Sequence, residues 1–147
     1  MVMLMSINEM LELAKKVISN AYSPYSHIRV AAVVKSKKGK LYVGVNVENA
    51  SYGLTICAER VAIFNALSTG EREFECMLIY SPDIFPWPCG ACRQVMAEFF
   101  EENTRIIVTN GKEVRELKFK DLWPPNFSFS KTFLIKNHSR RIKASPY

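Results

Sequence analysis

The sequence lacks long hydrophobic runs and contains little cysteine and histidine. No apolar stretch approaches the roughly 20 residues that a transmembrane helix needs, so we expect no membrane association. Residues 1–5 are apolar, but polar and acidic residues follow closely, which is not the pattern of a secretory signal. Four cysteines in 147 residues are too few for a disulfide framework. We therefore expect a cytoplasmic protein whose grouped cysteines bind a metal or form a redox pair.

Acidic residues are also absent from residues 130–147, which carry five basic residues. Residues 1–129 hold 15 basic residues against 14 acidic ones, a net charge of +1. We therefore expect one domain over residues 1–129 and a basic C-terminal tail over residues 130–147. Such a tail could bind nucleic acid or stay solvated. Because it has few aromatic residues and no recognition motif, we do not expect nucleic acid as a partner.

Hydrophobic periodicity predicts an alternation of helices and strands. Helices are expected over residues 6–21, 56–68, from about 89 onward and over 118–122, and strands over residues 28–35, 41–47, 76–80, 105–109 and 113–117. Ser6 and Glu9 have the spacing of a capping box, and Thr55 is the expected N-cap of the second helix. This order favours an α/β fold with a single mixed sheet covered by helices.

Three cysteines stand where two of these helices begin. Cys57 lies at the start of the helix over residues 56–68, and Cys89 and Cys92 open the next. Residues three apart share a helix face, and helix N-termini favour the thiolate form of cysteine. Three thiolates from two helix starts would leave the fourth tetrahedral position of a zinc ion open, which is typical of a catalytic zinc site.

Glu59 follows Cys57 by two residues and would lie beside the metal without binding it. Zinc turns a bound water into a nucleophile near neutral pH, and a neighbouring carboxylate can pass the proton of that water to a substrate. The chain reads CAE at residues 57–59 and PCGAC at residues 88–92. This order of motifs resembles that of the zinc deaminases.

Three thiolates and one Zn²⁺ sum to a charge of −1, which opposes ionisation of the bound water, so we expect positive charge nearby. Arg60 and Arg93 follow the helix-opening cysteines closely. We predict that at least one of them, Arg60 before Arg93, donates a hydrogen bond to a thiolate and tunes the metal site.

Two simpler interpretations remain beside this one. The pair Cys89 and Cys92 could be a redox centre, which would leave Cys57 and Glu59 without a purpose. A structural zinc would need a fourth protein ligand, and the spare candidates are Cys76, His27 and His138. Cys76 lies in an expected strand and is typical of a core residue, while both histidines stand in polar surroundings and fit solvated side chains.

From about residue 21 to residue 127, the chain resembles the small, homotetrameric cytidine deaminases of pyrimidine salvage. The resemblance is densest over NVENASY at residues 46–52, CAER at residues 57–60 and PCGACRQV at residues 88–95. It implies a three-layer α/β sandwich with a five-stranded mixed sheet and helices on both faces. It also implies an enzyme that hydrolyses cytidine and 2′-deoxycytidine to uridine and 2′-deoxyuridine with release of ammonia.

The resemblance further implies roles for single residues. Cys57, Cys89 and Cys92 would ligate one zinc ion per subunit, and Glu59 would shuttle protons. Four residues would hold the nucleoside: the side chains of Asn46 and Glu48 at the ribose 3′-hydroxyl, the backbone of Ala58 at the pyrimidine, and Phe127 at the base bound by a neighbouring subunit. Asn46 and Glu48 alternate along an expected strand, so their side chains should point the same way.

The chain departs from the family at Ile28, where an aromatic Phe is usual, and at Ala31, which replaces a usual Gly. An aromatic pair contributes about 0.5–1.5 kcal/mol beyond burial, enough to change affinity without abolishing activity. Two alternative functions stay open. One is the same chemistry on a nucleoside-like antibiotic or a polynucleotide, although the Glu48 carboxylate would repel a 3′-phosphate. The other is a zinc-stabilised module that binds nucleic acid through the tail.

Overall fold

The computed structural model describes the backbone of residues 2–122 and the side chains of residues 7–122. Phe127, His138 and the expected basic tail lie outside the described residues. Within residues 2–122, no helix combines the length and the apolar character that crossing a bilayer requires.

Five strands form one mixed sheet, as the sequence predicted. They are β1 (Ala31–Ser36), β2 (Leu41–Val45), β3 (Phe74–Tyr80), β4 (Arg105–Thr109) and β5 (Val114–Lys118), in the order β2-β1-β3-β4-β5. The β3–β4 pair is parallel and the other three pairs are antiparallel. The first strand begins at Ala31 and not at residue 28. Residues 28–30 precede this strand and lie beside the pocket described below.

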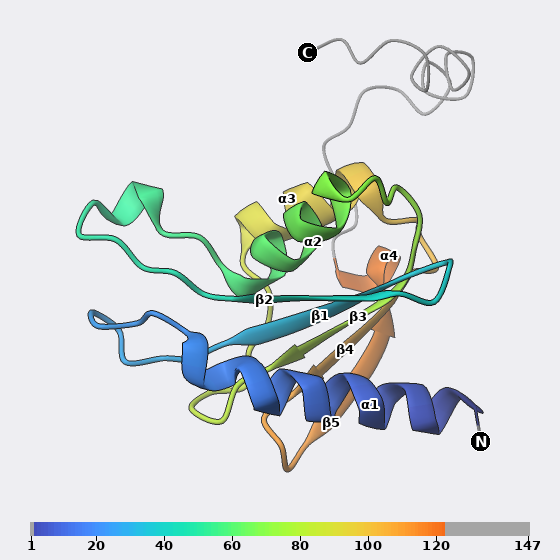
Figure 1. Cartoon of the computed structure of the whole chain (residues 1–147), viewed down its shortest axis with the longest axis horizontal. Helices are drawn as coiled ribbons and strands as arrows, with labels where there is room; N and C mark the ends of the chain where they lie inside the picture. Colours follow the sequence, from blue (N-terminus) through green and yellow to red (C-terminus); the bar gives the residue numbers. More distant parts are fainter. Residues whose placement is uncertain (1, 123–147) are drawn as a thin grey trace, which may run out of the picture.

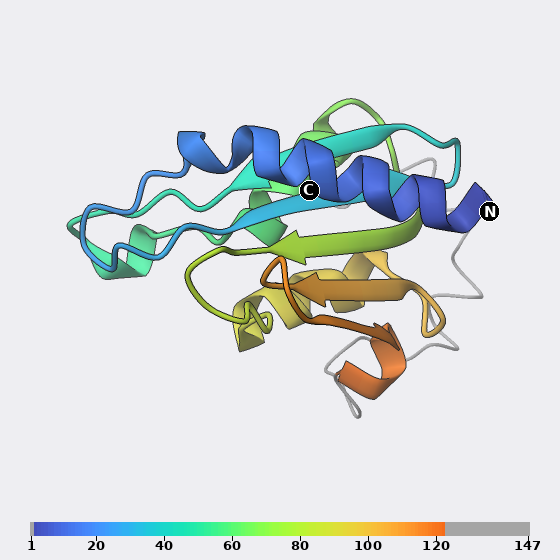
Figure 2. The same ribbon diagram turned by 90° about the horizontal axis from the view of Figure 1, so that it is seen from below.

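Helices cover both faces of the sheet, which gives the three layers (Figures 1 and 2). The helix α1 (Val2–Val17) packs on one face, and α2 (Ala58–Ser68) and α3 (Gly90–Phe99) pack on the other. Side chains alternate between the two cores, as the pleat of a strand requires. In β1, Ala31 and Val33 lie in the core beneath α1, whereas Ala32 and Val34 lie in the core beneath α2 and α3.

Two predicted helix starts are wrong. The helix α1 begins at Val2, so Ser6 lies inside it and is no N-cap, because Met and Leu in residues 1–5 are good helix formers. A short 3-10 turn (Ile18–Asn20) replaces the expected last helical turn. Cys57, and not Thr55, caps α2. The reason is that the backbone groups of Ile56 pair with those of Val47, which keeps the chain extended up to Cys57.

A close approach between β2 and α2 fixes where α2 begins. At Gly44, a Cβ atom would clash with the backbone of Ala58 and Ala62. Only glycine leaves room for α2 to lie this near the strand. The first turn of α2, and with it Cys57 and Glu59, is thereby held against the sheet. The remaining elements are a 3-10 turn (Tyr52–Leu54) and the helix α4 (Phe119–Leu122).

Candidate metal centre and substrate pocket

The three predicted zinc ligands come together. Cys57 is the N-cap of α2, Cys89 is the N-cap of α3, and Cys92 lies in the first turn of α3. Their sulfur atoms all lie within 4.8 Å of one another, with 3.8 Å from Cys57 to Cys89 and 3.5 Å from Cys89 to Cys92. Tetrahedral zinc with bonds of about 2.3 Å separates two sulfur ligands by roughly 3.8 Å. The cluster is therefore able to hold one zinc ion.

The fourth cysteine and the described histidine are not part of this cluster. Cys76 is buried beneath α1, where its thiol donates to the Met10 sulfur at 3.7 Å. Burial raises the pKa of the Cys76 thiol to about 11, so it stays neutral. Among the described residues, the metal-binding group contains Cys57, Cys89 and Cys92 and no fourth protein ligand. An open coordination position fits a catalytic zinc better than a structural one.

Positive charge lies next to the cluster, as the sequence led us to expect. The Arg60 guanidinium donates from Nη2 to the Cys57 sulfur at 3.4 Å. The pKa of the Cys57 thiol is lowered to about 5, because the Cys92 thiol and then Arg60 hydrogen-bond its thiolate form. The same contact and burial raise the pKa of the Cys92 thiol, so the protein alone favours the anion at Cys57 and a bound metal would ionise Cys92.

Arg93 acts on the backbone instead. Its Nε donates to the Pro88 carbonyl at 2.8 Å, and its Nη1 donates to the Leu122 carbonyl at 3.2 Å. The first bond fixes the chain directly before Cys89, and the second ties α3 to α4. Arg93 therefore supports the position of a sulfur ligand through the backbone before it.

Glu59 is the second residue of α2 and is only 4% exposed. Burial raises the pKa of its carboxyl group to about 7. A carboxyl group with a pKa near neutral can both accept and release a proton during turnover. Its place beside the sulfur cluster suits proton transfer to and from a metal-activated water.

A pocket of about 220 Å³ opens beside the cluster. It is a small, partly apolar cavity, which suits a small organic molecule. Its lining comes from the segment before β1, the chain after β2, the start of α2 and the loop between β3 and α3. The lining residues are Ser26, Ile28, Val30, Asn46, Glu48, Thr55, Ile56, Cys57, Ala58, Glu59, Ile84, Pro86, Trp87 and Cys89.

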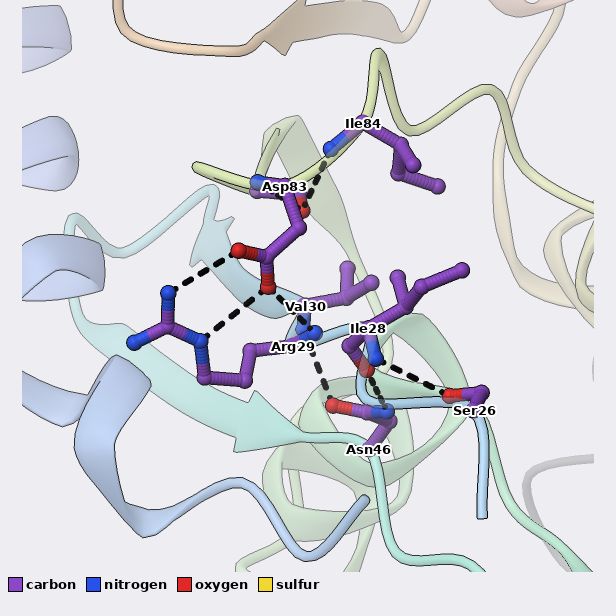
Figure 3. Close-up of polar contacts among 8 residues, drawn as sticks. Ser26, Ile28, Arg29, Val30, Asn46, Asp83 and Ile84 are labelled. Atoms are coloured by element: carbon purple, nitrogen blue, oxygen red, sulfur yellow. Dashed lines mark hydrogen bonds and ion pairs between the residues drawn. The ribbon is translucent and has the colours of Figure 1, made fainter. Parts of the chain in front are cut away.

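Asn46 and Glu48 both line the pocket, and both already hold the segment before β1. The Asn46 Oδ1 accepts from the Val30 N–H at 2.9 Å, and its Nδ2 donates to the Ile28 carbonyl at 2.8 Å (Figure 3). The Glu48 carboxylate accepts from the N–H groups of Tyr25 and Ser26 at 3.0 and 3.1 Å. The Ser26 hydroxyl also donates to Glu48, and this bond is the main cause that lowers the pKa of the Glu48 carboxyl group.

Several lining residues were not predicted from the sequence. Ile84, Pro86 and Trp87 belong to the proline-rich segment that leads into Cys89, and closeness to a metal ligand was the available signal. Trp87 is 48% exposed and is the aromatic side chain among the described lining residues. Ile28, where the family usually has Phe, also lines the pocket, so the departure falls on the site itself.

Three cysteine sulfurs able to hold zinc with its fourth position open, and a buried carboxyl group beside them, are the features of a hydrolytic zinc centre. The profile of the family described as "Cytidine and deoxycytidylate deaminase zinc-binding region" matches residues 5–109. The chain therefore belongs to this family of zinc-dependent deaminases.

Individual relatives agree with this family. The cytidine deaminase of Halalkalibacterium halodurans is 43% identical over 110 residues, which is 74% of this chain and 83% of that protein. The cytidine deaminase of Sporosarcina psychrophila is 39% identical over 126 residues, which is 84% of this chain and 93% of that protein. The crystal structure of cytidine deaminase from Burkholderia pseudomallei superimposes with a TM-score of 0.78 at 42% identity, covering 82% of this chain and 98% of that one.

Proposed function

We propose that this chain catalyses the hydrolysis of cytidine and 2′-deoxycytidine to uridine and 2′-deoxyuridine, with release of ammonia. The observation that carries the proposal is the buried Glu59 carboxyl group beside the Cys57, Cys89 and Cys92 sulfurs, on the wall of a small pocket. When bound there, zinc supplies the Lewis acidity that makes water nucleophilic near neutral pH. This chemistry serves the salvage of pyrimidine nucleosides.

The role of Glu59 is to move protons. It takes a proton from the attacking water and delivers it to N3 of the pyrimidine ring while the new C4–O bond forms. It then takes the proton of the new C4 hydroxyl group and passes it to the exocyclic nitrogen, so that the C4–N bond breaks, the C4 carbonyl forms and neutral ammonia leaves. Its pKa of about 7 suits both steps, because neither form of the carboxyl group is strongly favoured at neutral pH.

Other residues hold the nucleoside. Ala58 is the first residue of α2, so its N–H lacks an intrahelical acceptor and is available to the pyrimidine. Asn46 and Glu48 bind the ribose 3′-hydroxyl through the lone pairs and protons that their bonds to the backbone leave over. Arg60 stabilises the thiolates, and Arg93 positions Cys89 through the Pro88 carbonyl.

The test is the variant Glu59→Gln. It keeps the shape of the side chain and removes its ability to accept and release a proton, so turnover of cytidine should fall by about 10²–10⁴-fold. Zinc content should stay at one ion per chain. Glu12→Gln on the exposed surface of α1 is the control and should behave as the unchanged protein. Robust turnover by zinc-loaded Glu59→Gln would refute the role of Glu59.

We also propose a homotetramer with one zinc ion per subunit, in which subunits complete each other's sites through Phe127. Exposed apolar side chains near the pocket and on α2 support an interface there. They are Tyr22, Tyr25, Val47, Tyr52, Leu54 and Phe64. Sedimentation equilibrium should give four chains per particle, and Phe127→Ala should lower cytidine affinity without changing zinc content.

Residues 1–129 form the catalytic domain, supported by the family match over residues 5–109, and residues 130–147 form a basic tail that deamination does not need. A chain ending at residue 129 should therefore keep its activity. The four cysteines are free and form no disulfide, which supports a cytoplasmic protein.

A further inference from the structure

Two segments that line the pocket are joined by an ion pair that does not itself line it. The first segment, residues 26–30, leads into β1 and places Ile28 and Val30 in the lining. The second, residues 81–88, runs from β3 to Cys89 and places Ile84 and Trp87 in the lining. Between them, Arg29 and Asp83 lie 54 residues apart in sequence and directly contact each other (Figure 3).

The contact is a forked one. The Asp83 Oδ2 accepts from the backbone N–H and from the Nε of Arg29, at 2.9 and 3.0 Å. The Asp83 Oδ1 accepts from Nη2 of Arg29 at 2.9 Å. A planar guanidinium that binds both oxygens of a carboxylate fixes orientation as well as distance. The backbone donor adds a third bond, so Asp83 holds the chain of the first segment and not only a side chain.

Each partner is anchored on its own side. The Ser81 hydroxyl accepts from the N–H groups of Asp83 and Ile84 at 3.1 and 3.3 Å. Ser81 is itself buried, and its N–H donates to the Thr109 carbonyl in β4 at 3.2 Å. Asp83 is therefore fixed to the sheet at the start of the second segment.

The first segment is held from two directions. Asn46 binds the backbone of Ile28 and Val30, and Asp83 binds the backbone of Arg29 between them. The Arg29 side chain points away from the gathered apolar side chains of Ile28, Val30 and Ile84 (Figure 3). This alternation lets Arg29 reach Asp83 while its neighbours line the pocket.

We propose that the Arg29–Asp83 pair is a positioning device that sets the separation of residues 26–30 and 81–88, and thereby the fit of the pocket around its nucleoside. This inference rests on the proposed deaminase function. The sulfur cluster is held independently, since Arg93 fixes the Pro88 carbonyl, Cys57 is the N-cap of α2 and Glu59 lies in its first turn. The pair therefore acts on substrate affinity, and zinc binding does not depend on it.

If the pair only stabilised the fold, its loss would lower the free energy of unfolding and leave KM unchanged. The side chains of Arg29 and Asp83 are 45% and 26% exposed, and ion pairs this accessible to water contribute little to stability. A small displacement of a substrate-contacting wall, by contrast, has a large effect on reaction rates at subsaturating substrate. The structure thus predicts a change in KM that is out of proportion to the change in stability.

The experiment compares Asp83→Ala, Arg29→Ala and the double variant as full-length, zinc-loaded proteins. Each single variant should raise the KM for cytidine roughly tenfold, with kcat within about threefold of the unchanged protein. The double variant should be no worse than Asp83→Ala, because Asp83→Ala already removes all three bonds, whereas Arg29→Ala keeps the bond from its backbone N–H and should be no more severe than Asp83→Ala. Arg29→Lys keeps the charge but loses the two-point contact with the carboxylate, so its KM should lie between that of the unchanged protein and that of Arg29→Ala. Zinc content should stay unchanged throughout.

The matched control is Glu116→Ala, which breaks an ion pair with Arg105 on the β4–β5 hairpin, outside the pocket lining. It should leave KM unchanged. Equal KM values for Asp83→Ala and the unchanged protein, additive effects of the two single variants, or loss of zinc would each overturn the proposal.

Amide hydrogen exchange tests the positioning role of the Arg29–Asp83 pair independently of deaminase activity. If the unchanged protein does not deaminate cytidine, the function fails, but the same variants still report on the pair. Asp83→Ala should then speed exchange at residues 28–30 and at residues 83–84, whereas Glu116→Ala should not. Unchanged exchange at both segments would overturn the positioning role whatever the activity of the protein.

Discussion

Two parts of the pocket lining are built differently: the part with the sulfur cluster, which we call the metal end, and the part with Asn46 and Glu48, which we call the far end. At the metal end, Cys57, Cys89 and Cys92 lie at the first turns of two helices and contact one another. At the far end, Asn46 and Glu48 hydrogen-bond the backbone of the segment before β1. Side chains at the metal end converge on a point where a metal ion can bind. Those at the far end already hydrogen-bond the protein backbone and so contribute to the stability of the fold. Substitutions should therefore affect chemistry at one end, and stability together with affinity at the other.

The largest expected effect is at the metal end. Cys92→Ala removes a fully buried sulfur from the cluster, so zinc should be lost and deamination abolished. Cys76→Ala is the matched control, since Cys76 is also buried but lies beneath α1 away from the cluster. It should keep one zinc ion per chain and its activity, with a modest loss of stability. Mass spectrometry measures the zinc content, and an ultraviolet assay of cytidine measures the activity. Loss of zinc from Cys76→Ala would contradict the assignment of zinc binding to Cys57, Cys89 and Cys92 alone among the described cysteines.

The second effect tests how the cluster is tuned. Arg60→Ala removes the hydrogen bond to the Cys57 sulfur, and loss of such an outer partner typically costs about 10–100-fold in metal affinity or activity. Arg93→Ala should weaken zinc binding less, because Arg93 reaches the site only through the Pro88 carbonyl. Competition with a chelator of known affinity measures both. Equal zinc affinity in Arg60→Ala and the unchanged protein would show that the hydrogen bond has no influence on the metal.

The same contrast explains what the sequence could predict. The pairing of Cys89 with Cys92 follows from a local rule, because residues at a helix start and three positions later share one face. The meeting of this pair with Cys57, 32 residues away, was predicted from the order of the two motifs. The far end depends on pairs distant in sequence: Asn46 to Val30, Glu48 to Ser26 and Arg29 to Asp83. No local pattern indicates such contacts, so the sequence did not predict the bonds of Asn46 and Glu48 to the backbone or the ion pair between Arg29 and Asp83.

The wrong N-cap has the same physical origin. Thr55 has a favoured capping side chain, but pairing of Ile56 with Val47 overrides this local preference. The Thr55 hydroxyl accepts from the Asn49 N–H at 3.1 Å instead, within the loop. A single mixed sheet covered by helices was predictable because it depends on the hydrophobic pattern of whole elements, which a single long-range contact does not change, whereas the strand order was not predicted.

The third effect lies at the far end. Asn46→Ala leaves the Val30 N–H and the Ile28 carbonyl without their partner in a largely buried place, which should lower the free energy of unfolding by about 2 kcal/mol. Glu48→Gln, at a partly exposed carboxylate, should cost less than about 1 kcal/mol. Urea unfolding measures both.

A substrate analogue then separates fold from binding. The unchanged protein should prefer cytidine over its 3′-deoxy analogue, and Glu48→Gln should lose most of that preference. A folded Glu48→Gln with full discrimination would contradict a role in holding the 3′-hydroxyl.

The smallest effect is a dependence of stability on pH. The hydrogen bonds from Arg29 lower the pKa of the Asp83 carboxyl group below its usual value near 3.8. Because the folded-state pKa is the lower one, this stabilisation is fully present above about pH 4 and disappears as the pH falls through the folded-state pKa. Asp83→Asn has no such carboxyl group, so the difference in unfolding free energy between it and the unchanged protein should be constant from pH 7 to 5 and shrink below pH 4. Urea unfolding at fixed pH steps measures this, and a difference that grows on acidification would show that Arg29 does not stabilise the ionised carboxylate.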